Sequence, residues 1–530
     1  MAIVADVDVF IMGSGGAGLA AGARLKSLGA SVAIADEAQW PGGLLTGGLG
    51  LPDYVGVGAS TDTLSGFGRK FFLDCEVAAI ADGAVVGSPA DNSTTPPTPE
   101  VRGYGRQYAD LPRRYLPEWG RYARDKMLAG LQTFWDIEIV DFQIDQFTKL
   151  GGVVTFADGR QVKAKQFLSC SYEAQLGRAA KVPYTYGRSE NRATFDELLA
   201  GAYSNNRNTL PAALLNAKGD IIKGNQGYTT VAEGFGDLRV MAYNWRSTFS
   251  QHPNRLPFQA PMRPDGLPFR EADFEDWINE RGSKYTNIEQ ISSGQFVDQY
   301  CMTTNGGSQW GSPMEYVRCK TKAQRRLFWA WHYYYTAGWY YLAQNSPRVN
   351  PALRANMALW GLPPNHNVTE WFGQRGWSSH LYVRASHRMR SSGLISFENI
   401  GRSARGTVLE AMGRGGYHAD SHAKCHSTIP GGGYTQDGDM IDDVQDGRSY
   451  WNLPFAALKP PSAIIRNMLE VGCPAVSDIV ICSLRMEPTW MSIGEAAGVA
   501  AFVAVRDGIP VSEVPYSKIR ELTDSLGMKV

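Results

Sequence analysis

The feature that most constrains this chain is an apolar run that leads directly into a glycine fingerprint. Residues 7–12 predict a buried strand, and the pattern G-x-G-x-x-G occupies residues 13–18. Residues 19–28 are rich in alanine and leucine and predict a helix, and residues 31–35 predict a second strand. A strand–helix–strand unit of about 30 residues is the context in which such glycines predict a dinucleotide site.

Each glycine of the fingerprint has its own task in such a site. Gly13 permits the tight turn, Gly15 lets the backbone approach a pyrophosphate, and Gly18 allows the helix to pack closely on the strand. Gly16 and Ala17 open the helix, whose N-terminal N–H groups and partial positive charge face the phosphates. We therefore expect these five residues to form the phosphate end of the site.

Two acids follow the second predicted strand. Asp36 stands about 20 residues after the glycines, the spacing at which a carboxylate binds the ribose hydroxyls, and Glu37 is next to it. Residues 42–50 then contain many glycines, which let backbone lie flat against a ligand. This run therefore indicates a large planar ligand next to the ribose site.

Composition argues against several other classes of protein. The 52 basic and 52 acidic residues give zero net charge, so no overall field favours nucleic acid or an anionic membrane. The seven cysteines are scattered without a C-x-x-C pair, which argues against a disulfide framework and a zinc site. No basic signal-peptide region precedes the fingerprint, and the most hydrophobic run, 327–342, is too short to cross a bilayer. We expect a soluble cytoplasmic protein that acts on a small molecule, with no metal and no nucleic-acid or membrane partner; a homo-oligomer stays open.

In the remainder of the first 180 residues, short sequence patterns predict a surface segment, a helix and several strands. Residues 76–112 are rich in Pro, Ser, Thr and Gly and predict an excursion over the surface, for which a lid is one role. After it the patterns predict a helix, a strand, a hairpin and a returning buried strand, at residues 121–132, 137–144, 153–164 and 167–171.

Towards the C-terminus the apolar patterns return. Residues 479–481 predict a strand, and a helix that begins at Pro488 follows. One face of this helix carries four small residues, which lets another backbone pack against it: Gly494, Ala497, Gly498 and Ala501.

The two ends of the chain together predict one domain of α/β fold. We expect a Rossmann-like nucleotide-binding domain built from residues 1–180 and 456–530. Residues 181–455 differ in their sequence pattern, which indicates loops, many aromatic residues and long helices such as 322–344. This region predicts an inserted α+β substrate domain.

Several segments together resemble the FAD-dependent oxidoreductase family that contains xanthan-lyase-like flavoproteins, of the glutathione-reductase structural type. The resemblance extends over nearly the whole chain and is carried by segments 42–50, 171–176, 182–188, 242–246, 381–384, 420–422 and 485–488. It implies FAD as the cofactor, with further contacts from residues in or next to these segments: Gly43, Leu44, Thr46, Met486, Glu487 and Met491.

Two positions depart from the family pattern. Ser169 stands where the family usually has Asp, and Asp478 stands where it usually has His. The second change either removes a catalytic group or places a carboxylate near the ribityl chain. The helix after Pro488 would direct its positive end at the N1–C2=O edge of the flavin and stabilise the reduced form.

The segment 417–426 holds the candidate base. If it is extended, His418, Asp420 and His422 point to one side, so that Asp420 can hold His422 in one tautomer. We expect His422 to be the base that takes the substrate proton or the main hydrogen-bond partner that orients the substrate. His418 is the next candidate for the base, and Asp478 follows. A structural hydrogen-bond network and a metal site are the alternatives for this cluster.

Other residues of the resembling segments are candidates for substrate binding. We expect Arg246, Tyr382 and Arg384 to contact the substrate. Arg384, Arg388 and Arg390 lie close together in sequence, where they could clamp a carboxylate or form a solvated basic face. The aromatic stripe between 328 and 341 predicts core rather than a sugar-stacking wall.

These observations predict an FAD-dependent oxidoreductase. We expect it to remove hydride from a polar, hydroxylated or carbohydrate-like small molecule. Because no second glycine fingerprint follows a strand, we expect oxygen or another acceptor, rather than a nicotinamide nucleotide, to take the electrons. A redox-neutral lyase or isomerase on a similar substrate is the alternative, and a flavin-containing binding protein without turnover is a third.

Overall fold

The computed structural model describes residues 2–52, 64–83, 114–195, 234–292, 313–366, 374–396 and 451–530. It also describes shorter stretches at 85–86, 103–104, 106–108, 111–112, 200, 209–210, 295–296, 300–304, 399, 408–417, 419–422, 424–428, 434–437 and 440–441.

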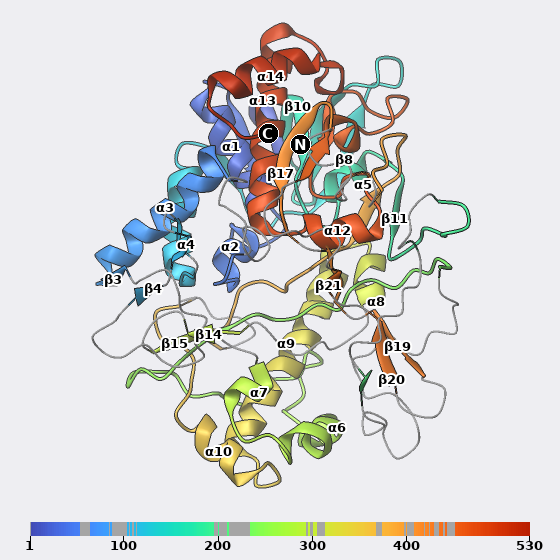
Figure 1. Ribbon diagram of the computed structural model, residues 1–530. Coiled ribbons are helices and arrows are strands. Elements are labelled where there is room, and N and C mark those ends of the chain that lie inside the picture. Colours follow the sequence, from blue (N-terminus) through green and yellow to red (C-terminus); the bar gives the residue numbers. More distant parts are fainter. Residues whose placement is uncertain are drawn as a thin grey trace.

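A seven-stranded sheet forms the centre of the upper part of the molecule in Figure 1. Five of its strands are parallel: β1 (Ala2–Met12), β2 (Val32–Ala35), β7 (Gln132–Phe134), β10 (Arg160–Ser169) and β23 (Met468–Glu470). β9 (Gly151–Phe156) and β8 (Ile139–Ile144) extend it antiparallel, in the order β7-β2-β1-β10-β9-β8. β23 pairs with residues 167–169 of β10, beyond the residues 161–163 that pair with β9. Strands from both ends of the chain therefore share one sheet.

The predicted strand–helix–strand unit is confirmed. Helix α1 (Gly16–Ser27) connects β1 to β2, and the two strands pair in parallel. The α/β, Rossmann-like fold class is therefore correct.

One predicted strand is a helix, and two others form a single strand. Residues 161–164 and 167–171 were expected as separate strands, but β10 runs without a break to Ser169, because Lys165 and Gln166 continue the alternation and no turn residue separates the two runs. Residues 479–481 lie in helix α12 (Asp478–Leu484), since Ser477 caps that helix by accepting the Val480 N–H at 3.3 Å.

Two other boundaries differ from the prediction. The helix expected at 121–132 is α4 (Pro117–Leu128), which begins at a proline suited to a first turn, and residues 132–134 form β7. Residues 76–81 belong to α3 (Gly66–Ala81) and not to a surface excursion. Most of the proposed lid lies outside the described residues.

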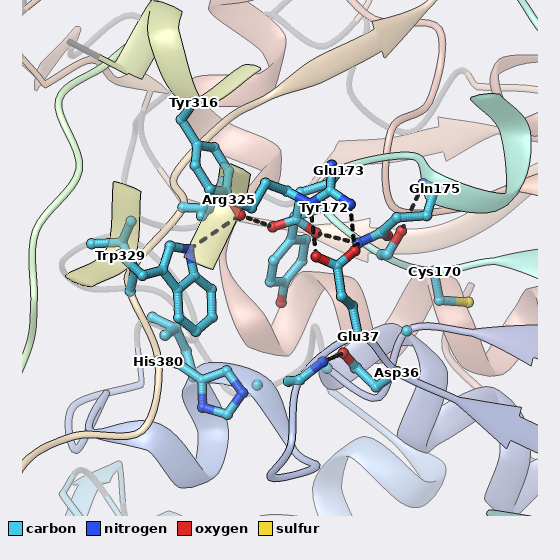
Figure 2. A pocket seen from close by; sticks show the side chains of 18 of the residues that line it. Asp36, Glu37, Cys170, Tyr172, Glu173, Gln175, Tyr316, Arg325, Trp329 and His380 are labelled. Carbon is cyan, nitrogen blue, oxygen red and sulfur yellow. Dashed lines mark hydrogen bonds and ion pairs between the residues drawn. The ribbon is translucent and has the colours of Figure 1, made fainter. Parts of the chain in front are cut away.

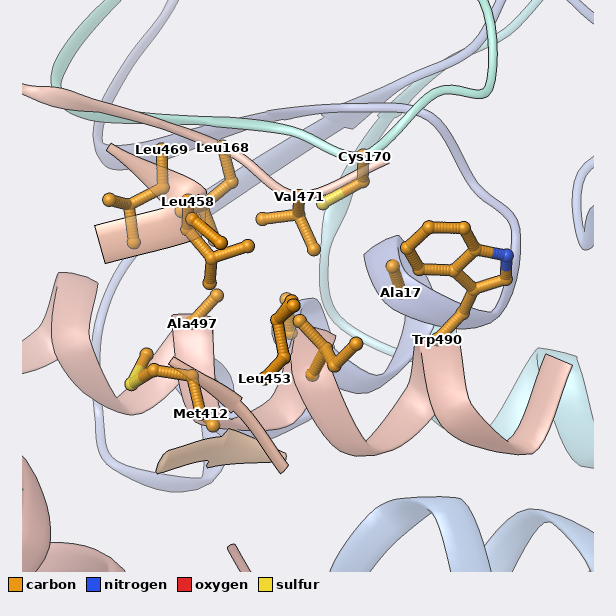
Figure 3. Packing of buried hydrophobic residues seen from close by; sticks show 14 of the residues in the cluster. Ala17, Leu168, Cys170, Met412, Leu453, Leu458, Leu469, Val471, Trp490 and Ala497 are labelled. Atoms are coloured by element: carbon orange, nitrogen blue, oxygen red, sulfur yellow. The ribbon is translucent and has the colours of Figure 1, made fainter. Parts of the chain in front are cut away.

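Helix α13 (Glu487–Asp507) packs in parallel along α1, with the two N-termini together. A Cβ on Gly494 would lie 2.1 Å from the Ala17 carbonyl oxygen, and one on Gly498 would lie 2.9 Å from that of Ala21. The predicted small-residue face is therefore confirmed. Figure 3 shows the buried side chains that surround this contact, Trp490 and Leu453 among them. Length and hydropathy would let α13 cross a membrane, yet 89% of the apolar stretch is buried inside the protein.

Helix α9 (Lys322–Asn345) organises a second core below the sheet in the view of Figure 1. Its N-terminus is capped by Thr321, whose side chain accepts the Gln324 N–H at 3.2 Å. Seven residues of the aromatic stripe are buried in this core: Phe328, Trp329, Tyr333, Tyr334, Tyr335, Trp339 and Tyr340. The interpretation of the stripe as core is confirmed.

The remaining helices are α2 (Gly43–Gly47), α5 (Gln175–Ala179), α6 (Glu275–Trp277), α7 (Ile288–Ser292), α8 (Pro313–Arg318), α10 (Pro351–Met357) and α14 (Tyr516–Ser525). The remaining strands are β3 (Val85–Val86), β4 (Gly103–Tyr104), β5 (Arg106–Tyr108), β6 (Leu111–Pro112), β11 (Tyr184–Tyr186), β12 (Thr209–Leu210), β13 (Thr248–Ser250), β14 (Gln295–Phe296), β15 (Cys301–Thr303), β16 (His387–Met389), β17 (Ala411–Gly415), β18 (Ala419–Asp420), β19 (Cys425–Thr428), β20 (Tyr434–Asp437), β21 (Met440–Ile441) and β22 (Trp451–Pro454).

Candidate functional site

The glycine loop between β1 and α1 has no room for side chains. Gly13 has φ +107°, and a Cβ there would lie 2.5 Å from the Ser171 backbone nitrogen. A Cβ on Gly18 would lie 1.8 Å from the Gly13 carbonyl oxygen. The helix therefore starts in direct contact with the strand that precedes it.

A pocket with an empty volume of about 640 Å³ opens beside this loop (Figure 2). Residues at the end of the sheet line one side of the pocket: Gly13, Gly15, Asp36, Glu37 and Tyr172. Gly43 and Leu44 come from α2. The middle region of the chain contributes Tyr316, Arg325, Trp329 and His380. The pocket is thus built jointly by the nucleotide fold and by the region inserted into it.

Asp36 is held against the glycine loop. Its Oδ2 accepts the Ser14 N–H and the Ser14 hydroxyl, each at 2.6 Å, and its Oδ1 accepts the Ala38 N–H at 2.7 Å. Burial raises the pKa of Asp36 above its ordinary value despite these hydrogen bonds. The Ser14 hydroxyl also accepts the Gly42 N–H at 3.1 Å. Asp36 therefore fixes the loop on which a nucleotide would lie.

Glu37 faces the inserted region instead. Arg325 on α9 donates from Nε at 2.8 Å and from Nη2 at 2.6 Å to the two oxygens of Glu37, and Gln175 donates to the same carboxylate at 3.1 Å. Both partners of the ion pair are buried. Glu37 thus connects the end of β2 to α9, and the pair forms one wall of the pocket (Figure 2).

A second carboxyl group lines the same wall. Glu173 accepts a hydrogen bond from the Tyr316 hydroxyl at 2.8 Å. Burial, with the charge of Glu37 nearby, raises the pKa of Glu173 to about 7. At neutral pH this carboxyl is therefore only partly ionised.

The carboxylate of Glu487 occupies the N-terminus of α1. Its Oε2 accepts the Gly16 N–H at 3.2 Å, and its Oε1 accepts a short hydrogen bond from the Tyr172 hydroxyl. Burial raises the pKa of Glu487 to about 7. Because α1 and α13 both begin here, two partial positive helix ends meet at this carboxylate. The helix ends favour an anion at this spot, but for Glu487 burial outweighs the hydrogen bonds that favour its charged form.

The glycine-rich loop lies between the pocket and the inserted region. Thr46 donates to the Pro41 carbonyl at 2.9 Å, and a Cβ on Gly43 would lie 3.1 Å from the Gly15 Cα. A Cβ on Gly47 would lie 2.6 Å from Nδ1 of His380. The loop is therefore packed closely on both sides.

Three predicted contact residues in this part of the molecule are buried side chains. Leu44 lines the pocket, Met486 caps α13, and Met491 lies on the first turns of that helix, where its Cγ would be 3.0 Å from a Cβ on Gly16. All three lie around the glycine loop and the start of α13.

An arginine cluster, defined as Arg246, Arg384 and Arg485, surrounds the Tyr382 ring. The guanidinium carbons lie 4.8, 5.0 and 5.8 Å from the ring centroid, distances typical of cation–π contacts. Arg485 donates to the Tyr382 hydroxyl at 2.8 Å, and Arg384 donates to the Ala242 carbonyl. All three arginines are buried, and burial beside Arg485 lowers the pKa of Arg384 to about 9.

Asp420 and His422 complete the cluster. Asp420 Oδ2 accepts from Arg485 at 2.8 Å and lies 3.3 Å from His422 Nε2. Burial by itself raises the pKa of Asp420, but His422 and Arg485 outweigh it and hold that pKa well below the usual range. Burial, together with the Arg384 charge, lowers the pKa of His422 to about 4. The imidazole is therefore neutral at neutral pH.

Several other candidates lie elsewhere or outside the described residues. Arg388 forms a buried ion pair with Glu190, so it is part of neither a substrate clamp nor a solvated face. Asp478 pairs with the buried Lys424 rather than with the arginine cluster. His418 lies outside the described residues. Within the part of the chain that the structure describes, no three metal-binding side chains come together.

The residues around the glycine loop fit a dinucleotide such as FAD. A Cβ on Gly15 would lie 3.0 Å from the Tyr172 hydroxyl, a tight contact that would require the Tyr172 side chain to shift. Gly13 and Gly15 line the pocket and would hold the pyrophosphate together with Gly16, and Asp36, which also lines the pocket, would bind the ribose. The flavin end would then lie towards the start of α13, where Arg485 stands two residues before Glu487.

Some residues of the site were not predicted. Tyr172, Glu173 and Arg485 lie inside segments that carry the family resemblance, so the resemblance could have indicated them as site residues. Arg325 and His380 carried no signal of that kind, because their positions depend on how the inserted region folds over the pocket.

The comparison with protein families agrees with this architecture. A family model described as FAD dependent oxidoreductase matches residues 8–523. No curated protein matches the chain.

Among solved structures, similarity is found over about a third of the chain. The Diels-Alderase PyrE3 of pyrroindomycin biosynthesis is 17% identical with a TM-score of 0.22, over 35% of this chain and 36% of that chain. A cyclohexanone monooxygenase mutant from Rhodococcus sp. Phi1 bound to NADP+ is 19% identical with a TM-score of 0.19, over 31% and 26%. The 3-ketosteroid-delta4-(5alpha)-dehydrogenase from Rhodococcus jostii RHA1 is 15% identical with a TM-score of 0.20, over 33% and 47%. The chain thus spans less than half the length of each of these structures.

Proposed function

Because this chain belongs to the FAD-dependent oxidoreductase family, we propose that it removes hydride from a polar, hydroxylated small molecule and passes the electrons to oxygen or another acceptor. FAD, when bound, supplies the hydride acceptor. The observation that carries the proposal is the Asp420–His422 pair, which Arg485 connects to the start of α13. A base thereby lies close to the expected flavin end of the site.

His422 has the arrangement that a proton acceptor needs. Its Nε2 faces Asp420 at 3.3 Å, which favours the tautomer with the proton on Nε2 and leaves Nδ1 to take the proton of a substrate hydroxyl. Asp420 in turn is held by Arg485 through its side chain at 2.8 Å and its carbonyl at 3.0 Å. The pair orients the ring and stabilises the imidazolium that forms.

Tyr382 is joined to this pair through Arg485, and the Arg246 guanidinium lies over the Tyr382 ring. The Tyr382 N–H donates to the Asn244 carbonyl at 2.9 Å, which joins the two segments in an isolated bridge. Both side chains are buried, so they would restrict water around a bound substrate and strengthen the charges that orient it.

Anaerobic mixing of the FAD-loaded protein with a panel of polyols, sugars and hydroxy acids tests the proposal. Lasting loss of the flavin absorbance with formation of the carbonyl product supports net oxidation. Product without lasting loss of colour would instead assign a redox-neutral lyase or isomerase. Neither product nor loss of colour with any compound would contradict an enzyme acting on hydroxylated molecules.

A further inference from the structure

Arg384 is a buried cation with an unused hydrogen-bonding edge. Among the described residues, its one hydrogen bond joins Nη1 to the Ala242 carbonyl, and its buried Nε has no acceptor. The guanidinium stands 5.0 Å from the centroid of the Tyr382 ring. A buried donor without an acceptor costs free energy, so an unmet partner is expected at this edge.

We infer that Arg384 binds a carboxylate group of the substrate, an inference that rests on the proposed function. A guanidinium is a planar fork, and the edge formed by Nε and Nη2 matches the two oxygens of a carboxylate. With Nη1 fixed on Ala242, that edge has a defined direction. The substrate class is therefore a hydroxylated carboxylic acid, such as a hydroxy acid or a sugar acid.

A carboxylate at Arg384 also changes His422. Burial and the Arg384 charge lower the pKa of His422 to about 4, which makes the free imidazole a weak base. The charged groups that face His422 are Asp420, which raises its pKa, and Arg384 and Arg485, which lower it. An anion on Arg384 offsets one of the two lowering charges and raises the pKa of His422. The substrate would thus strengthen the base that acts on it.

Acetate and its neutral analogue acetamide test the site without turnover. The FAD-loaded protein, with ¹³C-labelled histidine, is titrated with pH in the presence of each compound, and His422→Gln identifies the His422 resonance. Acetate should raise the pKa of His422 by about one pH unit, whereas acetamide should leave it unchanged. Equal effects of the two compounds, or none from acetate, would overturn the inference.

Variants assign the effect to Arg384. Arg384→Met should raise the pKa of His422 without any anion and abolish the response to acetate. Arg390→Met removes an exposed arginine nearby and should respond as the wild type does. If Arg384→Met fails to fold, Arg384→Lys keeps the charge and should retain a weaker response. An unchanged acetate response in a folded Arg384→Met protein would place the anion elsewhere and overturn the inference.

Matched substrates separate this inference from the proposed function. D-Glucuronate is compared with D-glucuronamide, and lactate with lactamide, as reductants of the flavin under anaerobic conditions. If the amides reduce the flavin as well as the acids do, the carboxylate inference fails and the dehydrogenation stands. If acetate acts through Arg384 but no hydroxylated compound reduces the flavin, the anion site stands and the proposed function fails.

Discussion

The Glu487 carboxylate accepts the backbone N–H of Gly16 at 3.2 Å, although the two residues are 471 positions apart. That N–H belongs to the first turn of α1, where the pyrophosphate of a dinucleotide is expected to bind. In the structure a protein carboxylate therefore takes the position of a ligand anion. FAD binding has to displace this carboxylate or bind beside it in its protonated form.

The affinity for FAD should fall as the pH rises through about 7. Burial raises the pKa of Glu487 to about 7, and a neighbouring pyrophosphate would raise it further, so the bound state retains a proton that the free protein loses above that pH. The dissociation constant of FAD, measured by quenching of flavin fluorescence, should increase by up to about tenfold per pH unit above this pKa.

Glu487→Gln should remove this dependence on pH, because the amide does not ionise. Glu513→Gln changes an exposed glutamate and should behave as the wild type. A dissociation constant that varies equally with pH in wild type and Glu487→Gln would contradict the role of this carboxyl.

The same carboxyl links stability to pH in the protein without FAD. Its pKa is raised from 4.5 to about 7 in the folded state, so folding retains a proton that the unfolded chain releases. The corresponding stability is fully present below the unfolded value and is lost as the pH rises to about 7. Between about pH 5 and pH 7, the melting temperature of Glu487→Gln should therefore fall by less than that of the wild type.

The protein should purify with FAD bound non-covalently, and Gly15→Val should lose most of it. A valine side chain at position 15 would meet the Tyr172 hydroxyl and fill the space beside the pocket. Gly152→Val is the matched control, since nothing lies within 4 Å of a Cβ there. FAD content is read from the absorbance after purification. A Gly15→Val protein with full FAD content would contradict the fingerprint interpretation, and colour that stays in the acid-precipitated pellet would show a covalent bond.

Asp36→Ala should weaken FAD binding more than Glu37→Ala does. Asp36 holds the glycine loop through Ser14, so its loss would release the loop on which the nucleotide would lie, whereas Glu37 holds Arg325 of the inserted region. Glu37→Gln should instead cost about 3–5 kcal/mol of stability, because it leaves the buried Arg325 without its carboxylate. Titration with FAD and thermal unfolding separate the two effects. The opposite order of affinities would mean that Glu37 binds the ribose.

His422→Ala should keep its yellow colour and lose flavin reduction by substrate about 10²–10⁴-fold, the usual contribution of a general base. His252→Ala, on a loop of the inserted region, is the control and should reduce at the wild-type rate. Tyr382→Phe and Arg384→Met should mainly raise the substrate concentration required. Stopped-flow absorbance measures both the rate of flavin reduction and the substrate concentration that it requires. A wild-type rate in His422→Ala would move the base to another residue.

The parts of the fold that the sequence predicted are those that local patterns determine. The unit from β1 to β2 needs only apolar alternation and glycines at fixed spacing. Its boundaries were close to those observed, except that β1 begins at Ala2, five residues before the predicted start. The helical state of residues 479–481 was missed because a β-branched run has no helical period, and the decisive signal was the single cap Ser477. Short apolar runs are ambiguous for this reason.

The candidate site was predictable only up to its long-range contacts. Asp420 and His422 lie two residues apart, so their pairing followed from the spacing. The partner of Glu37 lies 288 positions away on α9, and no local pattern connects them. Arg384 was expected to bind substrate, but its unused edge depends on the carbonyl of Ala242, which comes from a distant segment.

The packing of α13 on α1 also has a consequence for synthesis on the ribosome. The face of α1 that contains Ala17 and Ala21 is covered by residues near 494 and 498, which are made last. At about 5–20 residues per second, roughly half a minute to a minute and a half passes before that cover emerges. During this interval the apolar surface of the nascent domain is open to chaperones, and a chain truncated before β23 would expose it permanently.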